Sequence, residues 1–301
     1  DATLRAFLTT QAAFVGLKDT KLTGEDYLRI INGQVAVFRR CQNASGLIID
    51  PVMKIEWQYS TPCYTLSVAL LHASGYNLDP GLLESGVRAM DAAVTAMHEY
   101  RCAHNHGEFY LQPVMLALDL YALVLPQKQI QEWRDNLAPV DPFRLHPDNL
   151  QRRKTVYNHN VVALAGEYLR EKQGLAFPTN FFEPHLDNQR QYLTDLGMYK
   201  DPNTPIVYDE FSRQFLATIL CEAYSGPSRD FYRERLWRGA WMTLFMQSPS
   251  GESPTGGRSA QIAAPRSGND ISGMAVRQIS ALSPMSRAVQ LSASASPRAS
   301  I

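Results

Sequence analysis

Residues 195–213 read Asp-Leu-Gly-Met-Tyr-Lys-Asp-Pro-Asn-Thr-Pro-Ile-Val-Tyr-Asp-Glu-Phe-Ser-Arg and separate two segments that both have helical patterns. Gly197 suits the left-handed residue that ends a helix, and Asp209 can cap the helix that follows. Pro202 and Pro205 keep the chain between them extended. The stretch therefore predicts a rigid loop between two helices.

The same loop carries side chains that suit a polar, oxygen-rich ligand such as a sugar acid. These side chains are phenols, carboxylates and a guanidinium, from Tyr199, Asp201, Tyr208, Asp209, Glu210 and Arg213. Loops held by rigid elements often carry binding residues, and a guanidinium matches the geometry of a carboxylate. The plainer alternative is a turn followed by a helix cap.

Helical patterns recur along the chain on both sides of this loop. Apolar spacing and helix-start signals predict helices over residues 2–15, 23–40, 64–74, 81–100, 111–125, 127–137, 157–172, 180–196, 209–224 and 229–246. No stretch alternates in the manner of a strand. Short turns and elaborate polar loops alternate between the helices, so polar residues recur at every second junction. This arrangement predicts an all-α fold, an (α/α) toroid of helical hairpins, although an α-solenoid gives a similar pattern.

The composition limits the class of partner. The 301 residues are 45% hydrophobic, which is enough for a large all-helical domain. Lys+Arg and Asp+Glu both number 29 and no basic stripe is present, so we expect no nucleic-acid partner. No apolar run is long enough to cross a bilayer, and we expect no membrane partner. The four cysteines are widely spaced and are typical of small buried thiols.

The chain changes character near its C-terminal end. Ser, Ala, Arg and Pro dominate beyond Ile262, so we expect a toroid domain over residues 1–261 and a weakly ordered, low-complexity tail over 262–301. The first residue is Asp1, from which we expect a processed or partial chain. Asn43-Ala44-Ser45 is a glycosylation sequon, and a secreted or periplasmic location is favoured over a cytoplasmic one.

A cluster of histidines lies between two predicted helices, in residues 101–110. Histidine titrates near neutral pH, so His106 beside Tyr110 is a candidate proton-transfer pair, and Glu108 can bind sugar hydroxyls. His104 and His106 are also candidate metal ligands, but a metal site needs a third ligand and the chain lacks a helical His-x-x-x-His motif. We therefore expect no metal and no other cofactor. The alternative is a helix-entry loop with capping side chains.

Three further groups carry candidate binding residues. Asn158 and His159 stand at a helix start, where they can cap the helix or present donors to a carboxylate. Glu252 to Arg258 forms a loop of small residues whose glycines let the backbone approach a ligand and whose arginine can hold a carboxylate. Trp57 is a candidate stacking platform for a sugar ring.

Four segments together resemble those of sugar-acid enzymes of the α/α-toroid type, in bacterial and fungal proteins: residues 157–170, 197–203, 208–213 and 248–261. Their layout is similar to that of β-glucuronidase-like and unsaturated-uronyl glycoside hydrolases, and to that of heparinase- and alginate-lyase-like toroids. The resemblance covers roughly residues 40–261 and implies a toroid that acts on a uronic-acid-containing saccharide. A complete six-hairpin toroid usually needs a longer chain, so an incomplete C-terminal end is one expectation.

The first expectation for function is acid/base hydrolysis of a glycosidic bond. Asp201 and Asp209 are the candidate acid and base, because hydrolysis uses two carboxylates, and His106 and Tyr208 assist them. The candidate substrate-binding residues are Trp57, Glu108, Tyr110, Asn158, His159, Tyr199, Arg213, Glu252 and Arg258. The expected partner is an oligosaccharide or another polar small molecule.

Three alternatives remain open at this stage. A polysaccharide lyase would use Tyr and His as acid and base in a β-elimination at a uronate. A catalytically inactive toroid would bind only a glycan or a protein partner. The same fold can also host chemistry on a small molecule that is not a sugar.

Overall fold

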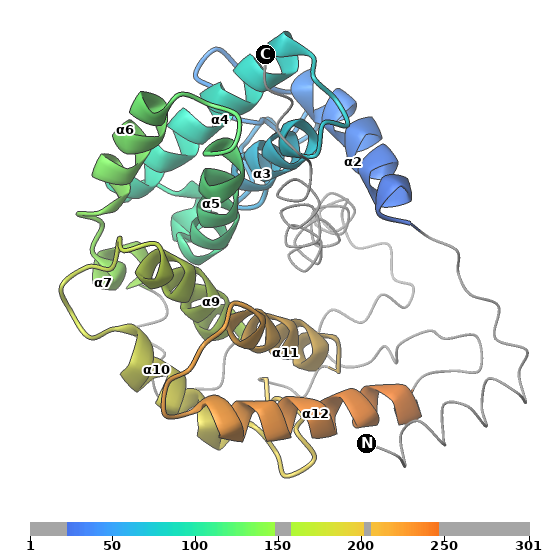
Figure 1. Ribbon diagram of the computed structural model, residues 1–301, viewed down its shortest axis with the longest axis vertical. Coiled ribbons are helices and arrows are strands. Elements are labelled where there is room, and N and C mark those ends of the chain that lie inside the picture. Colours follow the sequence, from blue (N-terminus) through green and yellow to red (C-terminus); the bar gives the residue numbers. More distant parts are fainter. Residues whose placement is uncertain (1–22, 148–157, 202–205, 247–301) are drawn as a thin grey trace, which may run out of the picture.

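The computed structural model describes residues 23–147, 158–201 and 206–246, and these ranges are mostly helical (Figure 1). The only β pairing in them is three isolated bridges, so the predicted all-α class is confirmed. The predicted helix over residues 2–15, the tail over 262–301, and both Glu252 and Arg258 lie outside the described residues. No helix in the described ranges has the length and apolar character needed to cross a bilayer.

The helices form an inner and an outer row. The inner row consists of α3 (Ser60–Ala73), α5 (Glu108–Tyr121), α9 (Asn158–Lys172) and α11 (Ile206–Cys221), each packed against the next. The outer row and edge consist of α2 (Gly24–Arg39), α4 (Pro80–His98), α6 (Gln127–Leu137), α10 (Phe182–Gln189) and α12 (Arg229–Met246). Together the rows make an open arc (Figure 1). The inner helices begin at nearly equal intervals along the chain, as repeated hairpins do.

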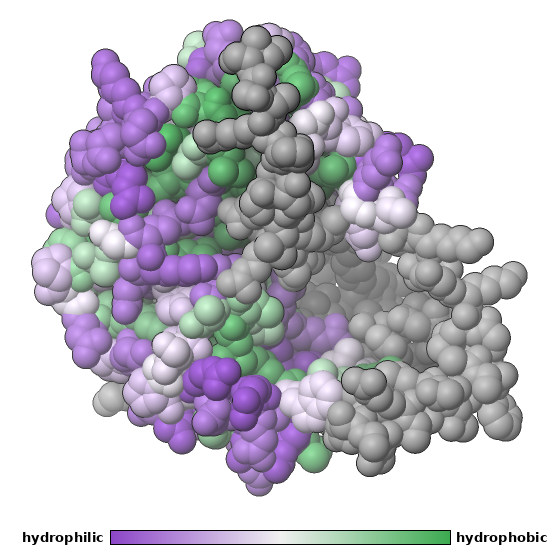
Figure 2. Space-filling view, viewed as in Figure 1, coloured by the Kyte–Doolittle hydropathy of each residue, from purple (hydrophilic) through white to green (hydrophobic). Residues whose placement is uncertain are grey.

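Burial follows the hydrophobic pattern of each row. In α3 every residue from Thr61 to His72 is buried, and α5 is buried on nearly all sides, which is typical of helices that lie inside a fold. In contrast, α6 buries only Ile130, Trp133 and Leu137, which lie on one face. On the face shown in Figure 2, hydrophilic side chains line the outer edge and hydrophobic ones appear between the helices. The core therefore lies between the two rows.

Helices α3, α5 and α11 begin three or four residues earlier than their apolar patterns indicated. Helix α3 starts at Ser60 and includes Pro62 in its first turn, where a missing backbone N–H is tolerated. Helix α5 starts at Glu108, so the polar residues Glu108 and Tyr110 belong to the helix and not to the loop before it. The predicted ranges 127–137 and 229–246 agree with α6 and α12.

The loop before α11 differs from its prediction. The helix expected over 180–196 ends sooner, as α10 followed by the short 3-10 helix η2 (Arg190–Tyr192). Leu193 then pairs with Tyr199 in an isolated bridge, and Gly197 has φ +79° inside this turn and not at a helix end. A Cβ atom at Gly197 would collide with the carbonyl of Arg235 on α12. Asp209 lies in the first turn of α11 and is not its cap, because the helix already starts at Ile206.

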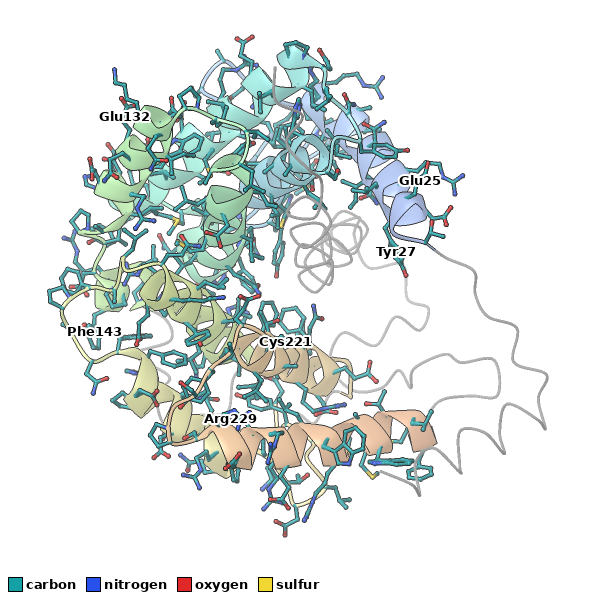
Figure 3. All side chains as sticks on the ribbon, in the orientation of Figure 1. Glu25, Tyr27, Glu132, Phe143, Cys221 and Arg229 are labelled. Atoms are coloured by element: carbon teal, nitrogen blue, oxygen red, sulfur yellow. The ribbon has the colours of Figure 1, made fainter. Side chains whose placement is uncertain are left out.

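After α6, the described residues 138–147 are joined to α9 by a buried polar network. The short helix α7 (Pro142–Leu145) in this segment carries Phe143, which is labelled in Figure 3. The Phe143 ring packs edge-on against that of Phe181 at a centroid distance of 5.3 Å. His146 follows α7, and its Nε2 lies 2.9 Å from Glu167 on α9. Glu167 also pairs with Arg170 at 2.8 Å, and all three side chains are buried. The Glu167–Arg170 pair is thus part of the core.

Candidate functional site

The candidate site lies where the starts of α3, α5 and α9 meet. Interactions across these starts join residues that are distant in sequence. Tyr110 Oη donates to Glu56 Oε1 at 2.7 Å, and the Tyr59 and Phe109 rings meet edge-on at 4.6 Å. We call this group the helix-start cluster; its members are Glu56, Trp57, Gln58, Tyr59, His104, His106, Glu108, Phe109, Tyr110, Asn158 and His159.

Glu108 is the centre of the helix-start cluster. Its side chain is 1% exposed, and its Oε1 lies 2.8 Å from Nδ1 of His106 and 2.7 Å from Nδ1 of His159. The two imidazole side chains are 20% and 14% exposed, and their ring centroids are 5.0 Å apart. One buried carboxylate thus anchors two partly exposed histidines.

The charge of Glu108 decides the tautomer of both rings. Burial acts to raise the pKa of Glu108, but hydrogen bonds from His106 and His159 outweigh it and lower the pKa to about 2. An ionised carboxylate only accepts hydrogen bonds, so both Nδ1 atoms must carry a proton. In a neutral imidazole the lone pair is then on Nε2, which is the arrangement of a histidine base oriented by a carboxylate.

Phe109 holds the two imidazoles in place. It is buried, and its ring packs edge-on against His159 at a centroid distance of 4.8 Å and against His106 at 5.7 Å. Such edge-to-face contacts favour defined ring orientations. The cluster is therefore fixed by packing as well as by hydrogen bonds.

The loop before α5 has an unusual backbone. His104 and Asn105 both have positive φ, 56° and 59°. This left-handed region costs about 1–2 kcal/mol for residues other than glycine, although asparagine tolerates it better. His104 Nδ1 lies 2.8 Å from Oε1 of Gln58, and its ring is 4.8 Å from that of Trp57. Strained backbone of this kind often occurs at functional sites.

Tyr110 does not form the predicted proton-transfer pair with His106. Its side chain is fully buried, and its hydroxyl donates to Glu56 and accepts from the backbone N–H of Ala103. Burial and the Glu56 carboxylate raise the pKa of Tyr110, so the phenol keeps its proton. Burial also raises the pKa of Glu56, against the hydrogen bonds that it accepts from Thr61 and Tyr110. Tyr110 thus ties α5 to the loop before α3.

Asp201 adjoins the cluster through the start of α9. Its Oδ1 accepts hydrogen bonds from the backbone N–H of Asn158 at 2.7 Å and from its Nδ2 at 3.0 Å. The side chain is 2% exposed. A carboxylate in this position satisfies one of the N–H groups that a helix start leaves without a partner. The geometry is that of a helix-capping group.

Asp209 belongs to a separate ionic group. Arg213 donates to its two oxygens from Nε at 2.9 Å and from a terminal nitrogen at 2.8 Å. Asp209 also accepts from the backbone N–H of Tyr199, and Arg213 donates to Thr243 on α12. Because both charged side chains are buried, this bidentate pair joins α11, the preceding loop and α12.

The two tyrosines of the loop differ in exposure. Tyr199 is buried, and its hydroxyl donates to Oε1 of Gln189 at 2.6 Å. Tyr208 is partly exposed, and its ring meets that of Phe211 edge-on at 6.1 Å. Of the predicted site residues in the described ranges, Trp57, His106, His159 and Tyr208 are therefore the partly exposed ones.

The structure brings together three possible metal ligands that differ from the predicted pair, because His104 bonds to Gln58 and is not among them. His106, Glu108 and His159 each offer one ligand atom, and these atoms all lie within 4.8 Å of one another. Sequence reasoning assigned the three residues to separate roles because His159 is far from the other two along the chain. The usable signal was the regular spacing of the inner helices, which brings the starts of α5 and α9 together.

Comparison of the chain with protein families, with curated proteins and with solved structures gives no match. Function is therefore inferred from the geometry of the helix-start cluster.

Proposed function

We propose that this protein cleaves a glycosidic bond in a uronic-acid-containing saccharide by β-elimination, on an (α/α) toroid scaffold. The observation that carries the proposal is the pair of partly exposed histidines, His106 and His159, anchored through Nδ1 on the buried carboxylate of Glu108. The two rows of helices, with polar residues at the starts of the inner row, support the toroid.

The reaction needs a base and an acid. One imidazole takes the proton from the carbon next to the uronate carboxylate, and the electron pair of that C–H bond forms a carbon–carbon double bond. The bond to the glycosidic oxygen breaks, and the second imidazole, in its protonated form, gives a proton to the leaving oxygen. The 5.0 Å between the ring centroids of His106 and His159 lets both rings face one substrate.

The substrate carboxylate must be stabilised while the neighbouring carbon loses its proton. The starts of α3 and α5 lie at the cluster and have no side-chain cap, and helix N-termini favour bound anions through their backbone N–H groups and dipoles. The start of α9 already binds the carboxylate of Asp201. Trp57, partly exposed beside His104, offers a ring face for a sugar. These features favour an anionic saccharide over a neutral one.

Elimination fits the structure better than hydrolysis does. A hydrolase needs one carboxylic acid that donates a proton and one carboxylate that activates water or attacks the sugar. The candidates for those roles, Asp201 and Asp209, are both 2% exposed and bind Asn158 and Arg213 respectively. The imidazoles are the more accessible acid–base groups.

The test is incubation of the purified chain with uronate-containing oligosaccharides, read by ultraviolet absorbance and by product mass. We expect a new absorbing double bond and no added water. We also expect His106→Ala and His159→Ala to lose this activity. Addition of water without new absorbance would instead support hydrolysis, and unchanged activity in both variants would contradict the role of the histidines.

A further inference from the structure

The three groups at the centre of the cluster have the composition of a metal site. His106 and Glu108 come from the start of α5 and His159 from the start of α9, and their ligand atoms lie within 4.8 Å of one another. Two imidazole nitrogens and one carboxylate oxygen are a common zinc-binding set, in which a fourth position stays open for water or substrate.

We propose that His106, Glu108 and His159 bind one divalent ion of the zinc type, and that this ion switches off the acid–base function of the two histidines. Metal binding by itself does not depend on the proposed elimination activity, but the inhibition rests on it.

The surroundings of the three ligands favour an ion. Glu108 is buried and supplies a negative charge, and Phe109 already limits the orientation of both imidazoles. The histidine side chains are 20% and 14% exposed, so an ion can enter from the solvent side. Zinc bonds to nitrogen and oxygen are about 2.0–2.2 Å long, which requires only a modest separation of the atoms that now share hydrogen bonds.

Inhibition follows from the atoms involved. Both histidines point Nδ1 at Oε1 of Glu108, so an ion held between them replaces the two Nδ1 protons. A neutral imidazole that binds a metal through Nδ1 carries its remaining proton on Nε2. The lone pair that would accept the substrate proton is then absent. The ion and the abstraction of the substrate proton therefore require different tautomers of the ring that acts as the base.

The experiment is calorimetric titration of the chelator-treated full chain with zinc chloride, repeated with cobalt(II) to record its absorption spectrum. We expect one ion per chain, and a cobalt spectrum typical of a four-coordinate site with three protein ligands. Loss of a ligand in His159→Ala should weaken binding at least about 10- to 100-fold, the range seen even for residues that only support metal ligands. His98→Ala is the matched control, because His98 is an exposed histidine on α4 that contacts Asn136.

Each outcome is decisive for the metal site. No binding by the wild-type chain, or equal affinity in wild type and His159→Ala, would overturn it. Glu108→Gln should also lose the ion. Circular dichroism will show whether this buried substitution preserves the helices. If the helices are lost, the affinity of His159→Ala for zinc decides whether the site binds metal. Zinc binding by a chain without any elimination activity would contradict the proposed function but support the metal site. Activity that persists at saturating zinc would remove the inhibition alone.

Discussion

The carboxylate of Glu108, on α5, lies 2.7 Å from Nδ1 of His159, on α9. This contact joins the first turns of two neighbouring inner helices, between which the chain forms the outer helix α6. Because Glu108 also binds His106, one buried negative charge orients both candidate acid–base groups. The site and the packing of the inner row thus depend on the same side chain.

Replacing His159 tests the acid–base role most simply. His159→Ala removes one imidazole but leaves Glu108 bonded to His106. We expect the turnover rate to fall about 100- to 10,000-fold, the usual contribution of a general acid or base. Steady-state kinetics on a uronate oligosaccharide measures this change. His98→Ala should behave as wild type, and an equal fall in that control would show that the loss is not specific to the site.

Asp201→Asn separates elimination from hydrolysis. The substitution keeps an oxygen that can accept from Asn158, so the start of α9 should retain much of its cap. We expect the variant to keep most of its turnover, in contrast to His159→Ala. If the variant has a wild-type circular dichroism spectrum but no turnover, Asp201 is a catalytic residue and the hydrolase alternative is supported.

The ionisation of Glu108 predicts how stability depends on pH. Burial opposes ionisation, but the hydrogen bonds from His106 and His159 lower the pKa of Glu108 from 4.5 to about 2. A carboxyl group with a lowered pKa in the folded protein contributes stability that is present above its unfolded pKa and lost as pH falls toward the folded one. We expect the Glu108→Gln variant to lose less of its free energy of unfolding than wild type does as pH falls from 4.5 to about 2, measured by denaturant unfolding. An unchanged pH profile would show that Glu108 does not contribute to it.

The Asp209–Arg213 pair is expected to matter for folding. Arg213→Met leaves Asp209 buried without its bidentate partner, and removing one member of a buried ion pair costs about 3–5 kcal/mol. Denaturant unfolding measures this cost. The double variant Asp209→Asn with Arg213→Met should lose less than the single variants combined, since it leaves no uncompensated charge. Strict additivity would contradict the coupling.

Gly197 and Gly174 make a matched pair of glycines with positive φ, +79° and +71°. A side chain at Gly197 would meet the backbone of Arg235 and Gly239, whereas nothing lies within 4 Å of a Cβ atom at Gly174. Both alanine variants carry the strain of a left-handed residue, about 1–2 kcal/mol. We expect Gly197→Ala to be clearly less stable in thermal unfolding than Gly174→Ala. Equal destabilisation would show that α12 can move away from the loop.

The helices were largely predictable from the sequence because their signals are local. The amphipathic pattern of Gln127–Leu137 gave both ends of α6. The starts of α3 and α5 were predicted too late, because polar residues such as Glu108 occupy the first turn and look like loop residues. The helix before Gly197 was predicted too long, because the bridge between Leu193 and Tyr199 depends on pairing that no local pattern shows.

The residues of the site were mostly identified, but their partners were not. His106, Glu108 and His159 were all candidates, yet only tertiary structure shows that one carboxylate holds both histidines. Asp201 and Asp209 were chosen as a catalytic pair because acids near Pro202 stand in a polar loop. The bond from Asn158 to Asp201 joins residues 43 positions apart, which spacing does not reveal. Asp209 and Arg213 have the i,i+4 spacing of a helical ion pair, but their burial is not visible in the sequence.

The most direct test of the central claim is to run the reaction in water labelled with heavy oxygen. Elimination by His106 and His159 predicts an unsaturated product that carries no label from water, and loss of that product in His159→Ala. Label incorporated at the cleaved bond, together with a saturated product, would contradict elimination and identify a hydrolase. Failure of the wild-type chain to cleave any uronate-containing saccharide would contradict the proposed function as a whole.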